Sequence, residues 1–217
     1  MGLRMKQIFQ KYDKALIAEL PRTVFEGRIF VVDSESEAER AVRYLLSQPI
    51  LGFDTETRPN FQKWQHHKVA LLQVASDDVC FLFRLCNIGV PDCVVRLLDD
   101  RQVLKVGLSW HDDMRMLRQR RAIQGGEFVE LQQEIKKLGV DDMSLQKIYA
   151  NLFGEKISKG EQLSNWEADI LSEAQKRYAA TDAWACVNIY KEIERLTKEK
   201  NYTLIRHEET VSEAPQG

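Results

Sequence analysis

The chain has 217 residues and a net charge of −2, with 44% hydrophobic and 29% charged residues. This length suits one large α/β domain, and the composition excludes a chain that is disordered throughout. The near-neutral charge excludes the strongly basic surface of a protein that binds nucleic acid tightly over its whole length, but it leaves room for a local basic patch.

Apolar periodicity and turn signals predict a peripheral helix and linker at residues 1–25, followed by one domain at 26–200 and a loose tail at 201–217. The strands that we expect are 27–32, 50–56, 69–75, 79–83, 103–108 and 128–131, with 69–75 and 79–83 forming a hairpin. The helices that we expect begin near 34 and 109 or cover 91–99, 144–153 and 172–200. A capping box, Ser172 to Gln175, fixes the start of the last helix. This order predicts an α/β fold with a mixed sheet flanked by helices.

Two carboxylates, Asp54 and Glu56, follow the apolar run at residues 50–53. Because side chains alternate along a strand, Asp54 and Glu56 point to the same face. Two carboxylates side by side at the end of a core strand repel each other, and a divalent cation relieves that repulsion. The alternative is a solvated strand end with two surface acids, and this segment alone supports both interpretations equally.

Two further acids, Asp112 and Asp113, fall in the first turn of the helix that follows strand 103–108. A carboxylate at this place favours the helix dipole, which explains one of them without any function. Helical periodicity places Asp113 on the face of Met116 and Leu117. We therefore expect Asp113 to be the acid that points inward.

The last long helix carries Tyr178 and Asp182, which are four residues apart and so lie on one face. The residues around the pair are small or aromatic: Ala179, Ala180, Ala183 and Trp184. Alanines allow another backbone to pack closely, so a buried face is favoured over the alternative of a solvated Tyr–Asp pair.

These acids, in this order, resemble the motifs of the DEDD superfamily of 3′→5′ exonucleases, in its tyrosine-bearing branch. The matching segments are Phe-Asp-Thr-Glu at 53–56, Val-Gly-Leu at 106–108 followed by Asp113 and Met114, and Tyr-Ala-Ala-Thr-Asp at 178–182. Segments 69–73 and 163–166 are similar to the Werner-syndrome-type exonuclease domain and its ribonuclease D-like relatives. The likeness extends over residues 31–195, which is nearly the whole chain.

The resemblance implies a ribonuclease H-like fold, two divalent cations (Mg²⁺ or Mn²⁺), and release of nucleoside 5′-monophosphates from a free 3′ end. The residues that it identifies as catalytic are Asp54, Glu56, Asp113, Tyr178 and Asp182, and the four acids among them are the expected metal ligands. An unperturbed tyrosine titrates near ~10. Tyr178 is therefore expected to orient the attacking water rather than to deprotonate it.

The expected partner is nucleic acid with a free 3′ end. Residues 58–68 interleave cations with aromatic rings, which suits a single strand, although a hydrated loop explains that segment equally well. The substrate-binding residues that we expect are Thr55, Arg58, Phe61, Trp64 and Trp166. No helical domain of the ribonuclease D kind follows the catalytic part, which favours single-stranded or recessed DNA and a role in DNA repair. Trimming of RNA 3′ ends is one alternative. A catalytically silent binding relative is another, but the retention of every acid favours an active enzyme.

Membrane association and disulfide bonding are not expected. No apolar run approaches the ~20 residues of a membrane-spanning helix, and residues 1–12 lack the apolar centre of a secretion signal. The four cysteines, Cys80, Cys86, Cys93 and Cys186, form no CxxC pair and no zinc-like spacing with histidines. We expect buried free thiols and a cytoplasmic location, or a nuclear one in a eukaryote.

Overall fold

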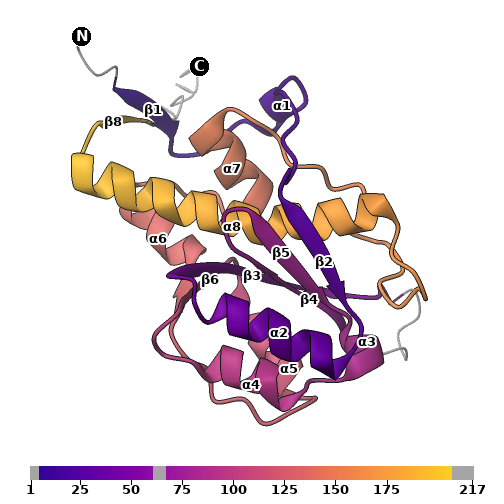
Figure 1. The fold of residues 1–217 in the computed structure, drawn as a ribbon. Coiled ribbons are helices and arrows are strands. Elements are labelled where there is room, and N and C mark those ends of the chain that lie inside the picture. The colour runs from indigo at the N-terminus through magenta and orange to yellow at the C-terminus, as the bar shows by residue number, and fades with distance from the viewer. Residues whose placement is uncertain (1–4, 61–66, 207–217) are drawn as a thin grey trace, which may run out of the picture.

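The computed structural model describes residues 5–60 and 67–206, and its centre is a six-stranded sheet with the order β2-β5-β4-β3-β6-β7 (Figure 1). The strands are β2 (Arg28–Val32), β3 (Ile50–Thr57), β4 (Val69–Ala75), β5 (Val79–Phe83), β6 (Leu104–Gly107) and β7 (Phe128–Glu130). Every strand lies within one residue of its predicted range. The predicted mixed sheet is confirmed.

Strand β3 lies inside the sheet, where antiparallel pairing changes to parallel pairing. It runs antiparallel to β4 and parallel to β6, while β4 and β5 form the predicted hairpin. Pairing between β3 and β6 ends at Gly52, whereas pairing between β3 and β4 continues to Thr57. The second half of β3, which carries Asp54 and Glu56, therefore has one edge that β6 does not cover.

Helices cover both faces of the sheet (Figure 1). One face carries α2 (Glu35–Leu45), α4 (Asp92–Asp99) and α5 (Trp110–Arg118), and the other carries α6 (Leu131–Lys137), α7 (Leu145–Phe153) and the long α8 (Glu173–Glu199). A short α3 (Leu85–Ile88) follows β5. The predicted capping box begins α8, because the side chain of Ser172 accepts from the backbone of Gln175 and the side chain of Gln175 accepts from the backbone of Ser172.

Helix α8 touches the backbone of β3 at Gly52. A Cβ atom at this position would lie 1.8 Å from the carbonyl oxygen of Ala183, so only glycine fits. Ala179, Ala180 and Ala183 are fully buried, as the predicted close packing requires. This contact brings Asp182 of α8 next to Asp54 of β3.

The two ends of the chain differ from their predictions. Residues 1–25 contain not only the short helix α1 (Lys14–Ile17) but also a strand, β1 (Lys6–Phe9). The predicted loose tail begins with a strand, β8 (Tyr202–Ile205), which pairs parallel with β1. Ile8 is fully buried against the core formed by α6, α7 and α8. A partner almost the whole chain away stabilises each strand, which local periodicity does not detect.

The cysteines are free thiols, as predicted. Cys80, Cys93 and Cys186 are buried, but Cys86 is exposed because it lies in the short helix α3, and its predicted burial is wrong. Within residues 5–60 and 67–206, no helix combines the length and apolar character needed to cross a bilayer.

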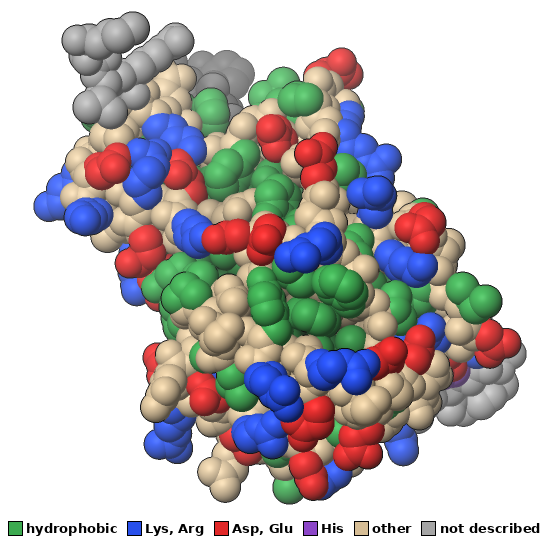
Figure 2. Space-filling view, viewed as in Figure 1, with side chains coloured by type: hydrophobic (Ala, Val, Ile, Leu, Met, Phe, Trp, Pro, Cys, Tyr) green, Lys and Arg blue, Asp and Glu red, His purple; other side chains and the backbone are tan. Residues whose placement is uncertain are grey.

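An apolar patch covers the edge of the sheet between β2 and α2, and it is visible near the centre of Figure 2. Phe30, Tyr44 and Phe81 line it. Phe30 is 44% exposed and stacks on Phe81 with ring centroids 5.4 Å apart. This patch shares no lining residue with the cavity that Asp54, Glu56 and Asp182 line.

Candidate active site

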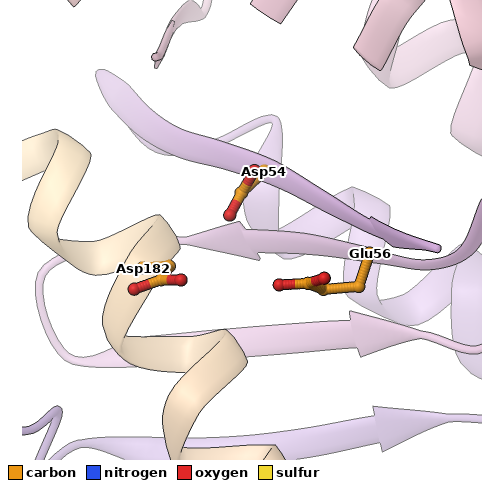
Figure 3. A group of neighbouring side chains, drawn as sticks. All are labelled: Asp54, Glu56 and Asp182. Carbon is orange, nitrogen blue, oxygen red and sulfur yellow. The ribbon is translucent and has the colours of Figure 1, made fainter. Parts of the chain in front are cut away.

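Three carboxylates from two elements meet beside the uncovered edge of β3. Asp54 and Glu56 project from the same face of β3, and Asp182 projects toward them from α8 (Figure 3). One carboxylate oxygen from each residue lies within 4.8 Å of the other two. Strand alternation and the Gly52 contact together produce this convergence.

These carboxylates are hard to ionise without a counter-charge. Burial raises the pKa of Asp54 to about 7, against a hydrogen bond from the backbone N–H of Thr55. Burial, together with repulsion from Asp54, Asp182 and Asp113, raises the pKa of Glu56 to about 10. Burial and Asp54 raise the pKa of Asp182 well above its usual range. Hard oxygen ligands that repel one another in a buried space fit Mg²⁺ or Mn²⁺.

Asp113 approaches this group from the opposite face of the sheet. It lies in the first turn of α5 and accepts a hydrogen bond from the hydroxyl of Thr55, which stands between Asp54 and Glu56 on β3. Burial, and then Asp54, raise the pKa of Asp113 to about 8. Its oxygens are outside the group of three that lie within 4.8 Å of one another. The neighbouring Asp112 is 75% exposed and pairs with Arg115, so Asp113 is the inward acid, as periodicity predicts.

A strained turn sets the start of α5. Ser109, its N-cap, has a left-handed backbone with φ of 61°. Its N–H donates to the carboxylate of Glu130 at 2.9 Å, and its hydroxyl accepts from the amide of Gln132 at 3.0 Å. This network holds α5, and therefore Asp113, in place.

Tyr178 lies one helical turn before Asp182 and also lines the cavity. Burial and the negative charge of Asp182 raise its pKa far above the usual value, so the phenol stays protonated at neutral pH. The ring packs on Trp166 with centroids 5.9 Å apart. Trp166 is fully buried, so its ring is not available to contact substrate, and that prediction is corrected. The ring of Trp166 packs against Tyr178 instead.

The other predicted substrate contacts have varied placements. Thr55 is engaged with Asp113. Arg58 is 45% exposed and pairs with Glu167 at 3.3 Å, which leaves part of its guanidinium open to solvent. Phe61 and Trp64 lie outside the described residues.

The acids open into a cavity of about 400 Å³. Residues of its lining that the sequence did not identify as site residues include Ser109, Gln132, Met143, Gln146, Lys159 and Cys186. They come from α6, α7, α8 and the loops beside α5 and α7, and none belongs to the acidic motifs. The predicted start of a helix near residue 109 is a sequence signal for Ser109.

The raised pKa values predict a distinctive dependence of stability on pH. In the metal-free protein the folded state keeps protons on Asp54, Glu56 and Asp113. The unfolded chain releases these protons at lower pH, because its pKa values are 3.8 for Asp and 4.5 for Glu. Stability contributed by this site therefore falls as the pH rises from about 4 toward about 10. A cation competes with these protons, so Mn²⁺ should raise Tm more at about pH 8 than at about pH 5.

Thermal melts in chelator and in Mn²⁺, for the parent and for Glu56→Gln, provide the measurement. In chelator, the Tm of Glu56→Gln should rise relative to the Tm of the parent as the pH increases. A constant difference, or a Mn²⁺ effect that is larger at acid pH, would contradict the pKa assignment.

Comparison with known proteins agrees with this geometry. A family model described as 3′-5′ exonuclease matches residues 29–198. The bifunctional 3′-5′ exonuclease/ATP-dependent helicase WRN of Mus musculus is 30% identical over 153 residues, which are 68% of this chain and 11% of that protein. A 3′-5′ exonuclease of Arabidopsis thaliana is 28% identical over 192 residues, 81% of this chain and 67% of that protein. The chain thus spans a small part of the mouse relative and about two thirds of the plant one.

Solved structures show the same fold. The Nibbler EXO domain of Aedes aegypti superposes with a TM-score of 0.71 at 22% identity, over 80% of this chain and 91% of that one. Escherichia coli RNase D gives a TM-score of 0.69 at 17% identity, over 79% of this chain and 45% of that one. The family model, which covers most of the chain, shows that this protein is an enzyme of the 3′-5′ exonuclease family, in the tyrosine-bearing branch of the DEDD superfamily.

Proposed function

We propose that the protein hydrolyses nucleic acid from free 3′ ends, with two divalent cations, and releases nucleoside 5′-monophosphates. The observation that carries this proposal is the convergence of Asp54, Glu56 and Asp182 in one cavity. A silent binding relative would have no reason to keep buried acids that repel one another, and this chain keeps them all. The active enzyme is therefore favoured.

The roles of the acids follow from their positions. Asp54, Glu56 and Asp182 would hold one cation, Asp54 would also reach a second, and Asp113 would serve that second one. When bound, two cations of this kind polarise the scissile phosphate and supply a nucleophile at neutral pH. Thr55, through its hydrogen bond to Asp113, fixes the orientation of that carboxylate.

Tyr178 would orient the attacking water. Its raised pKa keeps the hydroxyl protonated, so the phenol donates a hydrogen bond and does not act as a base. Trp166, packed against the ring, limits its movement.

Tyr178→Phe should lower turnover by about 10²–10⁴-fold, the range typical of one positioned group at a reacting centre. Affinity for a 3′-ended oligonucleotide should stay the same, because the ring and its packing remain. Single-turnover rates and binding in Ca²⁺ separate the two quantities. Tyr149→Phe is the matched control, since Tyr149 is a buried tyrosine of α7 outside the cavity lining. Parent-like turnover of Tyr178→Phe would make Tyr178 a packing residue only.

We propose DNA, single-stranded or recessed, as the substrate. Relatives by sequence include a protein named DNA polymerase I in Aquifex aeolicus, which supports DNA. Another relative is named ribonuclease D, and a solved structure of the same fold is the Trypanosoma brucei RNase D complex with RNA U12. RNA is therefore the competing substrate. A cavity of about 400 Å³ is large enough for one nucleotide, and Lys159 at its rim offers a cation to phosphate.

Turnover of DNA and RNA oligonucleotides of the same sequence tests this choice. DNA should be degraded faster, and a blocked 3′ terminus should stop degradation of either. Faster turnover of RNA would assign the protein to RNA 3′-end trimming and leave the chemistry of the site unchanged.

A further inference from the structure

One buried polar side chain beside the acids has no partner. Gln73, in the middle of β4, is fully buried, yet neither its amide nitrogen nor its amide oxygen has a hydrogen-bond partner among the described residues. Buried amides are almost always hydrogen-bonded. An unpaired buried amide destabilises the folded state, whereas a leucine at the same position would not. This position therefore calls for an explanation outside packing.

The sheet register places Gln73 directly opposite Asp54. Residues opposite each other in an antiparallel pair share a face, with Cβ atoms about 4.5–5.5 Å apart. A glutamine amide and an aspartate carboxylate can span that gap. Gln73 thus lies on the side of the sheet that α8 covers, next to the acid that the proposed mechanism shares between both cations.

The neighbours of Gln73 along β4 and on β5 are apolar on that face. Leu71 and Ala75 flank Gln73 along β4, and Leu82 of β5 is paired with it in the sheet. Alanines of α8 cover the same core. Of the two residues that the sheet pairs directly with Gln73, Asp54 and Leu82, Asp54 is the polar one.

The Asp54 carboxylate has room for such a partner. One of its oxygens, Oδ1, accepts the backbone N–H of Thr55 at 2.9 Å. Carboxylates that ligate metals generally also accept hydrogen bonds from other groups of the protein, and these bonds orient them.

We propose that Gln73 is a positioning residue, whose amide donates to the Asp54 carboxylate when the site holds its cation and so fixes the direction of the ligand oxygens. This inference rests on the proposed function. It explains why a buried amide without a protein partner among the described residues lies directly opposite Asp54 in the sheet.

Gln73→Met tests the proposal, because methionine keeps the length of the side chain and removes the donor. Isothermal titration with Mn²⁺, without substrate, should show affinity about 10–100-fold weaker than in the parent. The metal-free Tm of the variant should equal or exceed that of the parent, because methionine needs no partner. Leu82→Met, on the same face and the other side of Gln73, is the matched control and should leave Mn²⁺ affinity unchanged.

The outcomes are distinct. Unchanged Mn²⁺ affinity in Gln73→Met overturns the inference, whatever happens to activity, and leaves the proposed function intact. A parent protein whose Mn²⁺ binding does not depend on Asp54 overturns the proposed function itself. Should Gln73→Met fail to fold, Gln73→Leu is measured in the same way, and the same affinity criterion applies.

Discussion

Asp54→Asn and Asp182→Asn are each expected to lower the turnover of 3′ ends by at least about 10³-fold. Each removes one carboxylate ligand from a group whose oxygens lie within 4.8 Å of one another. Metal-ion stabilisation of a transition state is worth several kcal/mol, and about 1.4 kcal/mol corresponds to tenfold in rate. Initial rates of nucleotide release in Mg²⁺ and in Mn²⁺ provide the measurement.

The loss should reflect chemistry and not unfolding. Asp182 is a buried carboxylate that its neighbours repel, so Asp182→Asn should keep or raise the metal-free Tm. Glu39→Gln is the control, because Glu39 of α2 forms an exposed ion pair with Arg96 of α4. Near-parent activity in Asp54→Asn would rule out the assigned metal site.

Asp113→Asn should lower turnover by about 10²-fold or more, because in the proposed mechanism Asp113 would serve a second cation that stabilises charge in the transition state. Asp112→Asn, one residue away, should leave turnover unchanged. Its side chain is 75% exposed and pairs with Arg115 in the same helix, so its loss should change stability by about 0.3–1 kcal/mol at most.

These two variants control for each other, since they change the same chemical group in the same helical turn. Rates on one oligonucleotide and urea melts of both proteins give the comparison. A larger loss of turnover in Asp112→Asn than in Asp113→Asn would show that the site recruits the outer acid instead.

Local patterns predicted the parts of the fold that are stabilised locally. The strands of the central sheet have strong apolar runs or turn signals at their ends, and α8 has a capping box at Ser172. Strands β1 and β8 have four residues each and depend on one another across nearly the whole chain. A short strand of this kind carries no period long enough to identify, so local patterns predict the helix near the N-terminus but not β1 or β8.

The acids were predictable for a similar reason, and the surroundings of the acids were not. Strand alternation places Asp54 and Glu56 on one face, and helical spacing places Tyr178 near Asp182, so these positions follow from residues close in sequence. Trp166 shows the limit. An indole ring suits stacking on a base, but the loop that carries Trp166 buries this ring against Tyr178. Only the tertiary structure determines the path of that loop.

Glycine at position 52 illustrates how the fold makes the site. The sequence shows a glycine inside a strand, which weakens the strand and indicates close backbone approach. The structure identifies the approaching group as the Ala183 carbonyl of α8. Larger side chains here would push α8 away from β3 and separate Asp182 from Asp54.

The polarity and cation dependence of degradation test the central claim most directly. A 5′-labelled single-stranded oligonucleotide, incubated with the parent protein and Mn²⁺, should shorten stepwise from its 3′ end and release nucleoside 5′-monophosphates. Chelator, or the Asp54→Asn substitution, should abolish that ladder. Degradation that persists in chelator, or that begins at the 5′ end, would contradict the assignment of Asp54, Glu56 and Asp182 as the metal site of a 3′-5′ exonuclease.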